Sequence, residues 1–122
     1  MAERDLVEQA AEGVEDPAAF REACAVFGDA GALAHLQTFR ADLRTSLSRI
    51  GRGAMDTPSL REMAHRTAGR AGLLGFPALA DASAHLEEAI RTNAGVRIAL
   101  DRWTRQAQVA AQGGADEPPL ES

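Results

Sequence analysis

The chain has 122 residues, of which 45% are hydrophobic and 25% are charged; this balance is typical of one globular domain and excludes a disordered chain. Its 13 basic and 18 acidic residues give a net charge of -5, which argues against a protein that neutralises nucleic-acid phosphates. Cys24 is the single cysteine, so no intramolecular disulfide is possible. No segment resembles a signal peptide or a membrane span. We expect a cytoplasmic monomer with no nucleic-acid or membrane partner.

The first two predicted helices follow one another closely. Asp16 is a favourable N-cap and Pro17 a favourable first helical residue, and the apolar residues after them recur at helical spacing up to Gly28. A longer helix follows Asp29, with leucines at intervals of three and four, and ends at Gly51.

Three further helices are predicted in the second half of the chain. One begins near Pro58 and runs to about Gly75. The next begins at Pro77 and closes over residues 92–95, which suit a helix end. The last extends through residues 96–107. No stretch shows the strict alternation of a strand.

Amphipathic helices joined by short connections bury their apolar stripes most simply against one another. We therefore predict an all-α fold, an up-and-down antiparallel four-helix bundle with an additional short N-terminal helix. Residues 15–111 form the predicted domain and residues 1–14 an N-terminal segment. Residues 112–122 lack periodic apolar positions and are predicted to be a disordered acidic tail.

The helix between Pro58 and Gly75 separates into two faces at 100° per residue. The predicted core face contains Leu60, Met63, Ala64, Thr67, Ala71 and Leu74. His65 lies on the opposite face. Its neighbours there, three, four, seven or eleven residues away, are Arg61, Ala68, Gly69, Gly72 and Phe76.

Two glycines inside this helix, Gly69 and Gly72, together cost on the order of 2 kcal/mol relative to alanine. Glycine beside an exposed histidine lets another protein come close, so these residues are candidates for a docking surface. The spacing is equally compatible with another interpretation, in which both glycines serve helix packing and His65 is an ordinary exposed histidine.

The segment from Ala64 to Gly69, followed by Gly75, Leu79 and Leu86-Glu87, resembles the histidine-containing phosphotransfer (HPt) domain family. In that family a phospho-accepting histidine is followed by a glycine four residues later and by another near ten. The next helix is leucine-rich and ends in Leu-Glu. Residues 27–29 and 39–47 also match, so that the resemblance extends over roughly residues 15–110.

The resemblance implies that His65 carries a phosphoryl group, as phosphohistidine, between receiver-domain aspartates in a bacterial-type two-component phosphorelay. The expected partners are the receiver domain of a response regulator, a hybrid histidine kinase, or both. We find no ATP-binding loop and expect a phosphocarrier and not an enzyme. No metal or cofactor site is predicted in this chain, and Mg²⁺ is expected in the partner receiver.

One residue departs from the family pattern: Ala68 replaces the lysine that many members carry three residues after the histidine. Arg61, one turn earlier on the same face, could supply a positive charge, whereas Arg66 and Arg70 lie on a flank and would have to reach round. As single residues, all three are equally compatible with ordinary solvated arginines.

An alternative function is a phosphorylation-independent docking regulator of a histidine kinase or response regulator, and the missing lysine favours it. Asp81, Glu87 and Glu88 are interpreted as the solvated side of an acidic helix. His35 and His85 lack metal-type spacing.

Overall fold

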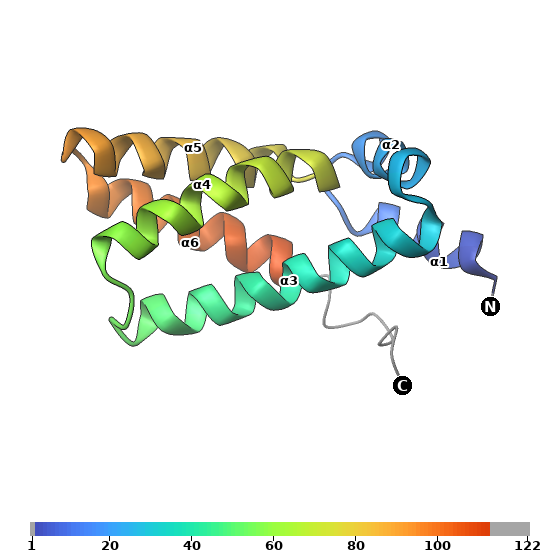
Figure 1. Ribbon diagram of the computed structural model, residues 1–122, viewed down its shortest axis with the longest axis horizontal. Helices are drawn as coiled ribbons and strands as arrows, with labels where there is room; N and C mark the ends of the chain where they lie inside the picture. Colours follow the sequence, from blue (N-terminus) through green and yellow to red (C-terminus); the bar gives the residue numbers. More distant parts are fainter. Residues whose placement is uncertain (1, 113–122) are drawn as a thin grey trace.

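The computed structural model describes residues 2–112, which form six helices (Figure 1). There is no strand within this range. The helices are α1 (Glu3–Glu12), α2 (Pro17–Phe27), α3 (Asp29–Gly51), α4 (Thr57–Leu74), α5 (Pro77–Thr92) and α6 (Val96–Gln112). The all-helical class and the five predicted helices are thereby confirmed.

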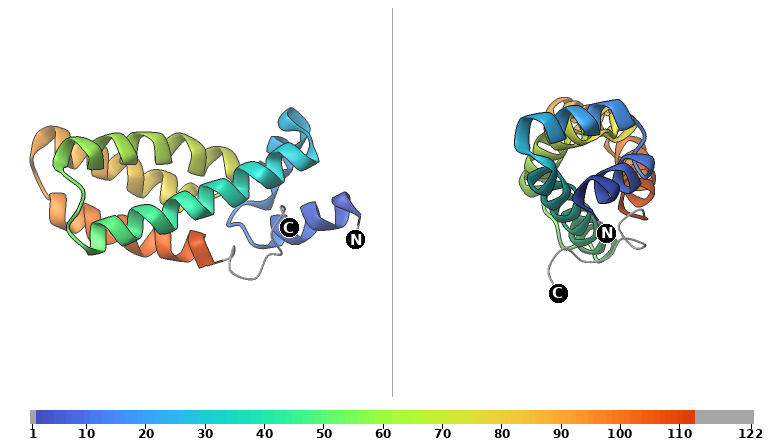
Figure 2. Two further views of the ribbon diagram at one scale, coloured as in Figure 1. Left: turned by 60° about the horizontal axis from the view of Figure 1, so that its bottom comes forward. Right: turned by 90° about the vertical axis from the view of Figure 1, so that its right-hand side faces the viewer.

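The four long helices α3 to α6 lie alongside one another, and α1 and α2 gather at one end of them (Figures 1 and 2). Helices α4 and α5 form the most extensive contact, followed by α5 with α6 and α3 with α6. Helix α2 packs on both α3 and α4. Helix α4 therefore lies between α3 on one flank and α5 on the other.

Helix α1 was not predicted from the sequence, in which residues 1–14 were described only as an N-terminal segment. Val7, Ala10, Ala11 and Val14 are buried in the common core, and their spacing of three and four is the signal that would have revealed this helix. At the other end, α6 includes Gln112, which the analysis placed in the tail. Residues 113–122, the rest of that predicted tail, lie outside the described residues.

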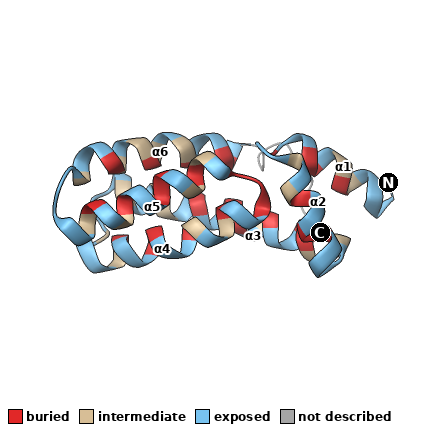
Figure 3. Ribbon diagram, turned by 90° about the horizontal axis from the view of Figure 1, so that it is seen from above, coloured by how far each residue is buried: buried red, intermediate tan, exposed pale blue. Residues whose placement is uncertain are grey.

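The core is aliphatic apart from a few large side chains, and its buried positions form inward stripes along the helices (Figure 3). Trp103 is fully buried on α6. Its indole Nε1 donates a hydrogen bond to Ser83 Oγ at 2.9 Å, so that the polar groups of both side chains are paired where they are buried. This contact fixes α6 against α5.

Arg40 on α3 is also completely buried. Its Nε donates to the Ala110 carbonyl at 3.0 Å and its Nη2 to the Gly13 carbonyl at 2.9 Å, while Arg44 donates to the Ala111 carbonyl at 3.0 Å. Carbonyls in the last turn of a helix have no partner within the helix and carry partial negative charge. The two arginines therefore stabilise the end of α6 and connect it to α3, and Arg40 also connects α3 to the end of α1.

The turn between α4 and α5 depends on Gly75, whose φ of 102° lies in the left-handed region. Its carbonyl accepts a hydrogen bond from the Asp16 amide at 2.8 Å. A Cβ at position 75 would lie 2.6 Å from the Asp16 carbonyl oxygen and 3.0 Å from a methyl carbon of Val14. The linker between α1 and α2 thus packs directly on this turn, and only glycine fits it without displacement.

Gly75→Ala should lower the free energy of unfolding by about 1–3 kcal/mol, because it adds both backbone strain and a steric clash. Gly69→Ala is the matched control: position 69 is helical and open, so alanine there should stabilise the protein by up to about 1 kcal/mol. Denaturant unfolding of both variants tests this difference. A Gly75→Ala protein as stable as the wild type would contradict the role assigned to the turn.

Candidate functional site

Helix α4 begins at a well-defined cap. The Asp56 carboxylate accepts a hydrogen bond from the Ser59 amide at 2.9 Å, and Pro58 occupies the first turn. Hydrogen bonds from the Ser59 hydroxyl and amide hold the pKa of Asp56 below its ordinary value. The buried residues of α4 are Leu60, Met63, Ala64, Thr67, Ala71 and Leu74, and the predicted core face is thereby confirmed.

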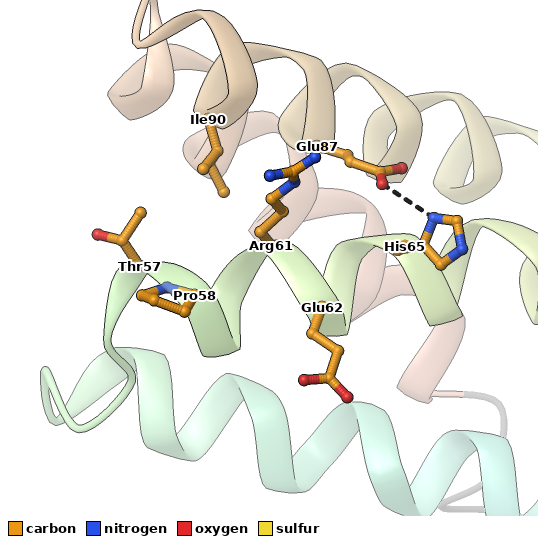
Figure 4. Close-up of a pocket in the computed structure, with 7 residues that line it drawn as sticks. All are labelled: Thr57, Pro58, Arg61, Glu62, His65, Glu87 and Ile90. Carbon is orange, nitrogen blue, oxygen red and sulfur yellow. Dashed lines mark hydrogen bonds and ion pairs between the residues drawn. The ribbon is translucent and has the colours of Figure 1, made fainter.

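His65 lies on the outer face of α4, where its side chain is 73% exposed. Its ring Nδ1 lies 2.9 Å from Glu87 Oε2 on α5 (Figure 4). An ionised carboxylate can only accept a hydrogen bond, so Nδ1 must carry the proton in this contact. In the neutral ring the lone pair is then on Nε2, which lies on the side of the ring away from Glu87 (Figure 4).

The contact of Glu87 with His65 was not predicted from the sequence, where this acid was assigned to the solvated side of its helix. The spacing within α5 gave no reason to expect the contact, because His65 and Glu87 are 22 residues apart. The signal was in the family pattern, where Leu86 and Glu87 were matched as a pair. Leu86 is fully buried, and its burial directs the following residue towards the edge of α5 that faces α4.

His65 and Glu87 line one end of an open groove of about 540 Å³ between α4 and α5. The other lining residues are Thr57, Pro58, Arg61, Glu62 and Ile90 (Figure 4). Pro58 and Ile90 give the groove an apolar part, while Arg61 adds a cation on the side of α4 that also bears the histidine. The groove therefore combines a ring nitrogen, a carboxylate and a guanidinium.

Arg61 attracts the acidic residue Glu88 on α5 electrostatically, without a direct ion pair. The pKa of Glu88 is lowered mainly by its hydrogen bond from Arg91, and Arg61 adds a weaker electrostatic attraction in the same direction. The Arg61 side chain extends from α4 towards α5 in the groove (Figure 4). Of the three arginines considered from the sequence, it is the one that shares a groove with His65.

Arg66 and Arg70 are directed to the other flank of α4. Arg66 pairs with Glu62 at 2.7 Å, one turn earlier on the same helix. Arg70 pairs with Asp42 on α3 at 2.9 Å and stacks over the Phe39 ring, 5.0 Å from its centroid. Both arginines line a cleft between α3 and α4. They therefore do not lie beside His65.

The remaining candidates around His65 differ in their surroundings. A Cβ at Gly69 would have no atom within 4 Å, and one at Gly72 would meet only the Ala80 Cβ at 3.9 Å, an ordinary contact. Helix packing therefore requires glycine at neither position. Ala68 is partly exposed and brings no charge to this face.

Phe76 does not belong to the exposed face, contrary to the sequence interpretation. Helix α4 ends at Leu74, and the left-handed Gly75 turns the chain before residue 76. Phe76 is consequently buried, with its ring 5.8 Å from that of Phe39 and beneath the Arg40 guanidinium. The helical projection failed here because it continued the 100° rotation beyond the end of the helix.

A model of the Hpt domain family matches residues 33–112, more than half of the chain. The chain therefore belongs to the Hpt domain family. Hpt domains are phosphocarrier modules, not enzymes, that act in two-component signalling and interact with receiver domains. The match begins at residue 33, so that α2, which the resemblance included from about residue 15, lies outside it. Helix α1 lies outside both the match and the resemblance. A search of curated proteins and one of solved structures found no match.

Two further properties concern the described range 2–112. None of its helices is both long and apolar enough to cross a membrane. Its histidine, cysteine and acidic side chains form no group of three or more that could hold a metal ion.

The contact between His65 and Glu87 predicts the tautomer of the neutral histidine. Nitrogen NMR of the imidazole should show Nδ1 protonated and Nε2 unprotonated in the wild type. Glu87→Ala should shift the ring towards the mixture of tautomers found in a free histidine, whereas Glu87→Gln should retain much of the preference because its amide oxygen also accepts a hydrogen bond. Identical tautomer populations in all three proteins would contradict this contact.

Proposed function

We propose that this protein is a phosphocarrier that accepts a phosphoryl group on His65 and passes it between receiver-domain aspartates in a two-component phosphorelay. The observation that carries the proposal is the hydrogen bond from His65 Nδ1 to Glu87, which leaves Nε2 exposed with its lone pair available. Membership of the Hpt domain family supports the same reaction class.

In the proposed reaction the Nε2 lone pair attacks the phosphorus of an aspartyl phosphate. The new bond is N–P, the bond that breaks joins phosphorus to the aspartate oxygen, and the aspartate leaves as a carboxylate. The ring keeps its proton on Nδ1 and gains positive charge, which the Glu87 carboxylate stabilises at 2.9 Å. No separate base is needed, because no proton has to leave the attacking nitrogen.

Arg61 is the residue that we propose to support the phosphoryl group in place of the lysine lost at Ala68. It shares the groove with His65, and a guanidinium can donate two hydrogen bonds to phosphate oxygens. Arg66 and Arg70 are paired with Glu62 and Asp42, and both arginines line the cleft between α3 and α4. The phosphoryl transition state also requires a metal ion, and we assign Mg²⁺ to the partner receiver, as the resemblance implies.

The proposed unit of transfer is residues 15–111, arranged as an up-and-down four-helix bundle with the N-terminal helices at one end. Helix α1 packs on α2 and α3, so we extend the folded unit to include it. The proposal also includes a monomeric state and a cytoplasmic location, where a hybrid kinase or response regulator would meet the groove between α4 and α5.

Phosphoryl transfer should depend on His65. Incubation with a panel of phosphorylated receiver domains should give acid-labile phosphate on the wild type and none on His65→Gln, which keeps a polar side chain of similar size. His85→Gln is the matched control, since His85 is an exposed histidine on α5 that does not line the groove. If no donor labels the wild type while receivers still bind it, the protein is instead a phosphorylation-independent docking regulator.

Gly69→Leu should slow transfer from a receiver at least tenfold without lowering the melting temperature. The position is open in the isolated protein and leucine favours helix, but the added side chain would stand one turn from His65 on the proposed docking surface. Gly69→Ala should transfer at close to the wild-type rate. Loss of folding together with transfer, or no effect of leucine on transfer, would contradict a docking role for Gly69.

A further inference from the structure

A second cleft, of about 250 Å³, lies between α3 and α4 on the flank of α4 away from His65 and α5. Figure 1 shows α3 and α5 on opposite sides of α4. The floor of the cleft is apolar and is formed by Phe39, Leu43 and Met63. Its rim is polar and carries most of the charge.

Three arginines from two helices meet at this rim: Arg49 from α3, and Arg66 and Arg70 from α4. The cleft also includes the side chains of Thr45 and Ser46, whose hydroxyls can donate hydrogen bonds. Asp42 is the one acidic residue in the lining, and Glu62 pairs with Arg66 at the rim, so that the arginines and these two acids carry a net charge of one positive unit. This charge contrasts with the net charge of -5 for the whole chain.

The ion pairs already present at the rim do not preclude a ligand. Arg66 and Glu62 are 60% and 70% exposed, and Arg70 and Asp42 are 37% and 57% exposed. Exposed pairs of this kind contribute about 0–1 kcal/mol. An anion with more charge than a carboxylate would therefore displace Glu62 and Asp42 from these arginines at little cost in free energy.

The distribution of charged residues along the chain also favours the binding of an anion in the cleft. Residues 40–112 contain eleven arginines and seven acidic residues, whereas residues 1–39 contain two arginines and eight acidic residues. The negative charge of the chain is thus concentrated in the N-terminal helices and the tail. The two helices that form the cleft, α3 and α4, contain six arginines and three acidic residues, and this excess of positive charge attracts a negatively charged ligand.

We propose that the cleft between α3 and α4 binds a small phosphorylated molecule, with its phosphate on Arg49, Arg66 and Arg70. Three guanidinium groups from two helices match an anion with several charged oxygens, because each can donate two hydrogen bonds to it. A monovalent carboxylate offers only two oxygens and one charge. This site is independent of the phosphotransfer reaction and does not involve His65.

Such a ligand would also stabilise the fold. Helices α3 and α4 make fewer direct contacts than α4 and α5, and a bridging anion would add bonds between them. A ligand that binds only the folded protein raises its melting temperature, and the rise grows with the logarithm of ligand concentration above the dissociation constant.

Titration of the full-length protein with inorganic pyrophosphate, followed by NMR at constant ionic strength, tests the proposal. We expect saturable shifts of the Thr45, Ser46 and Thr67 amides, and a rise in melting temperature that sodium acetate does not produce. Arg49→Gln and Arg66→Gln should each weaken binding about tenfold or more, since each removes charged hydrogen bonds. Arg105→Gln, an exposed arginine on α6, should bind as the wild type does.

His65→Gln distinguishes this site from the phosphotransfer groove, because it should leave the pyrophosphate affinity unchanged. Melting temperatures without ligand show whether each arginine variant is folded. The proposal is overturned if the shifts do not saturate, if acetate reproduces them, if they centre on His65 and Glu87, or if Arg105→Gln weakens binding as much as Arg66→Gln.

Discussion

The left-handed turn at Gly75 is the constraint on which the site depends. It reverses the chain within two residues of the end of α4, so that α5 returns along α4 in the most extensive helix contact of the fold. This return brings Glu87 opposite His65, 22 residues earlier in the sequence. In the same turn, the Gly75 carbonyl accepts a hydrogen bond from the Asp16 amide. The Glu15 carboxylate accepts another from the Ala78 amide at 2.8 Å. The N-terminal helices are therefore fixed to the turn that aligns the site.

Helix α4 presents different chemistry to its two neighbours. Towards α5 it offers His65 and Arg61, and towards α3 it offers Arg66 and Arg70. Successive residues are 100° apart on a helix, so that His65 and Arg66 point to different flanks although they are adjacent in the chain. The arginines that sequence spacing places near the histidine are consequently divided between two surfaces.

Local signals were sufficient to predict most of the fold. The caps at Asp16 and Asp56 and the apolar stripe of α4 act within a few residues, so their physical effect can be read from the sequence. Helix α1 was not predicted although its buried residues follow helical spacing, because two of the three, Ala10 and Ala11, are alanines and carry little apolar signal. Phe76 was misplaced because the helical rotation was continued to a residue beyond the predicted helix end at Gly75.

Contacts between distant segments could not be predicted in this way. The buried Arg40 binds carbonyls of Gly13 and Ala110, 27 and 70 residues away, and nothing in the pattern of α3 indicates that a helix end lies there. Glu87 is a similar case, since a partly exposed acid on an acidic helix is ordinarily solvated. Its role becomes evident only when α5 is packed against α4.

The arrangement at His65 explains why a phosphocarrier needs few groups of its own. With Nδ1 held by Glu87, Nε2 would require no deprotonation before the proposed attack. In the proposed reaction the partner provides both the phosphorus and the metal, so this chain controls mainly how closely the two proteins approach. An open groove and a helix surface left bare at Gly69 suit that task. In the proposed relay, a contact that must form and release with each transfer favours a small interface, below about 1,200 Å².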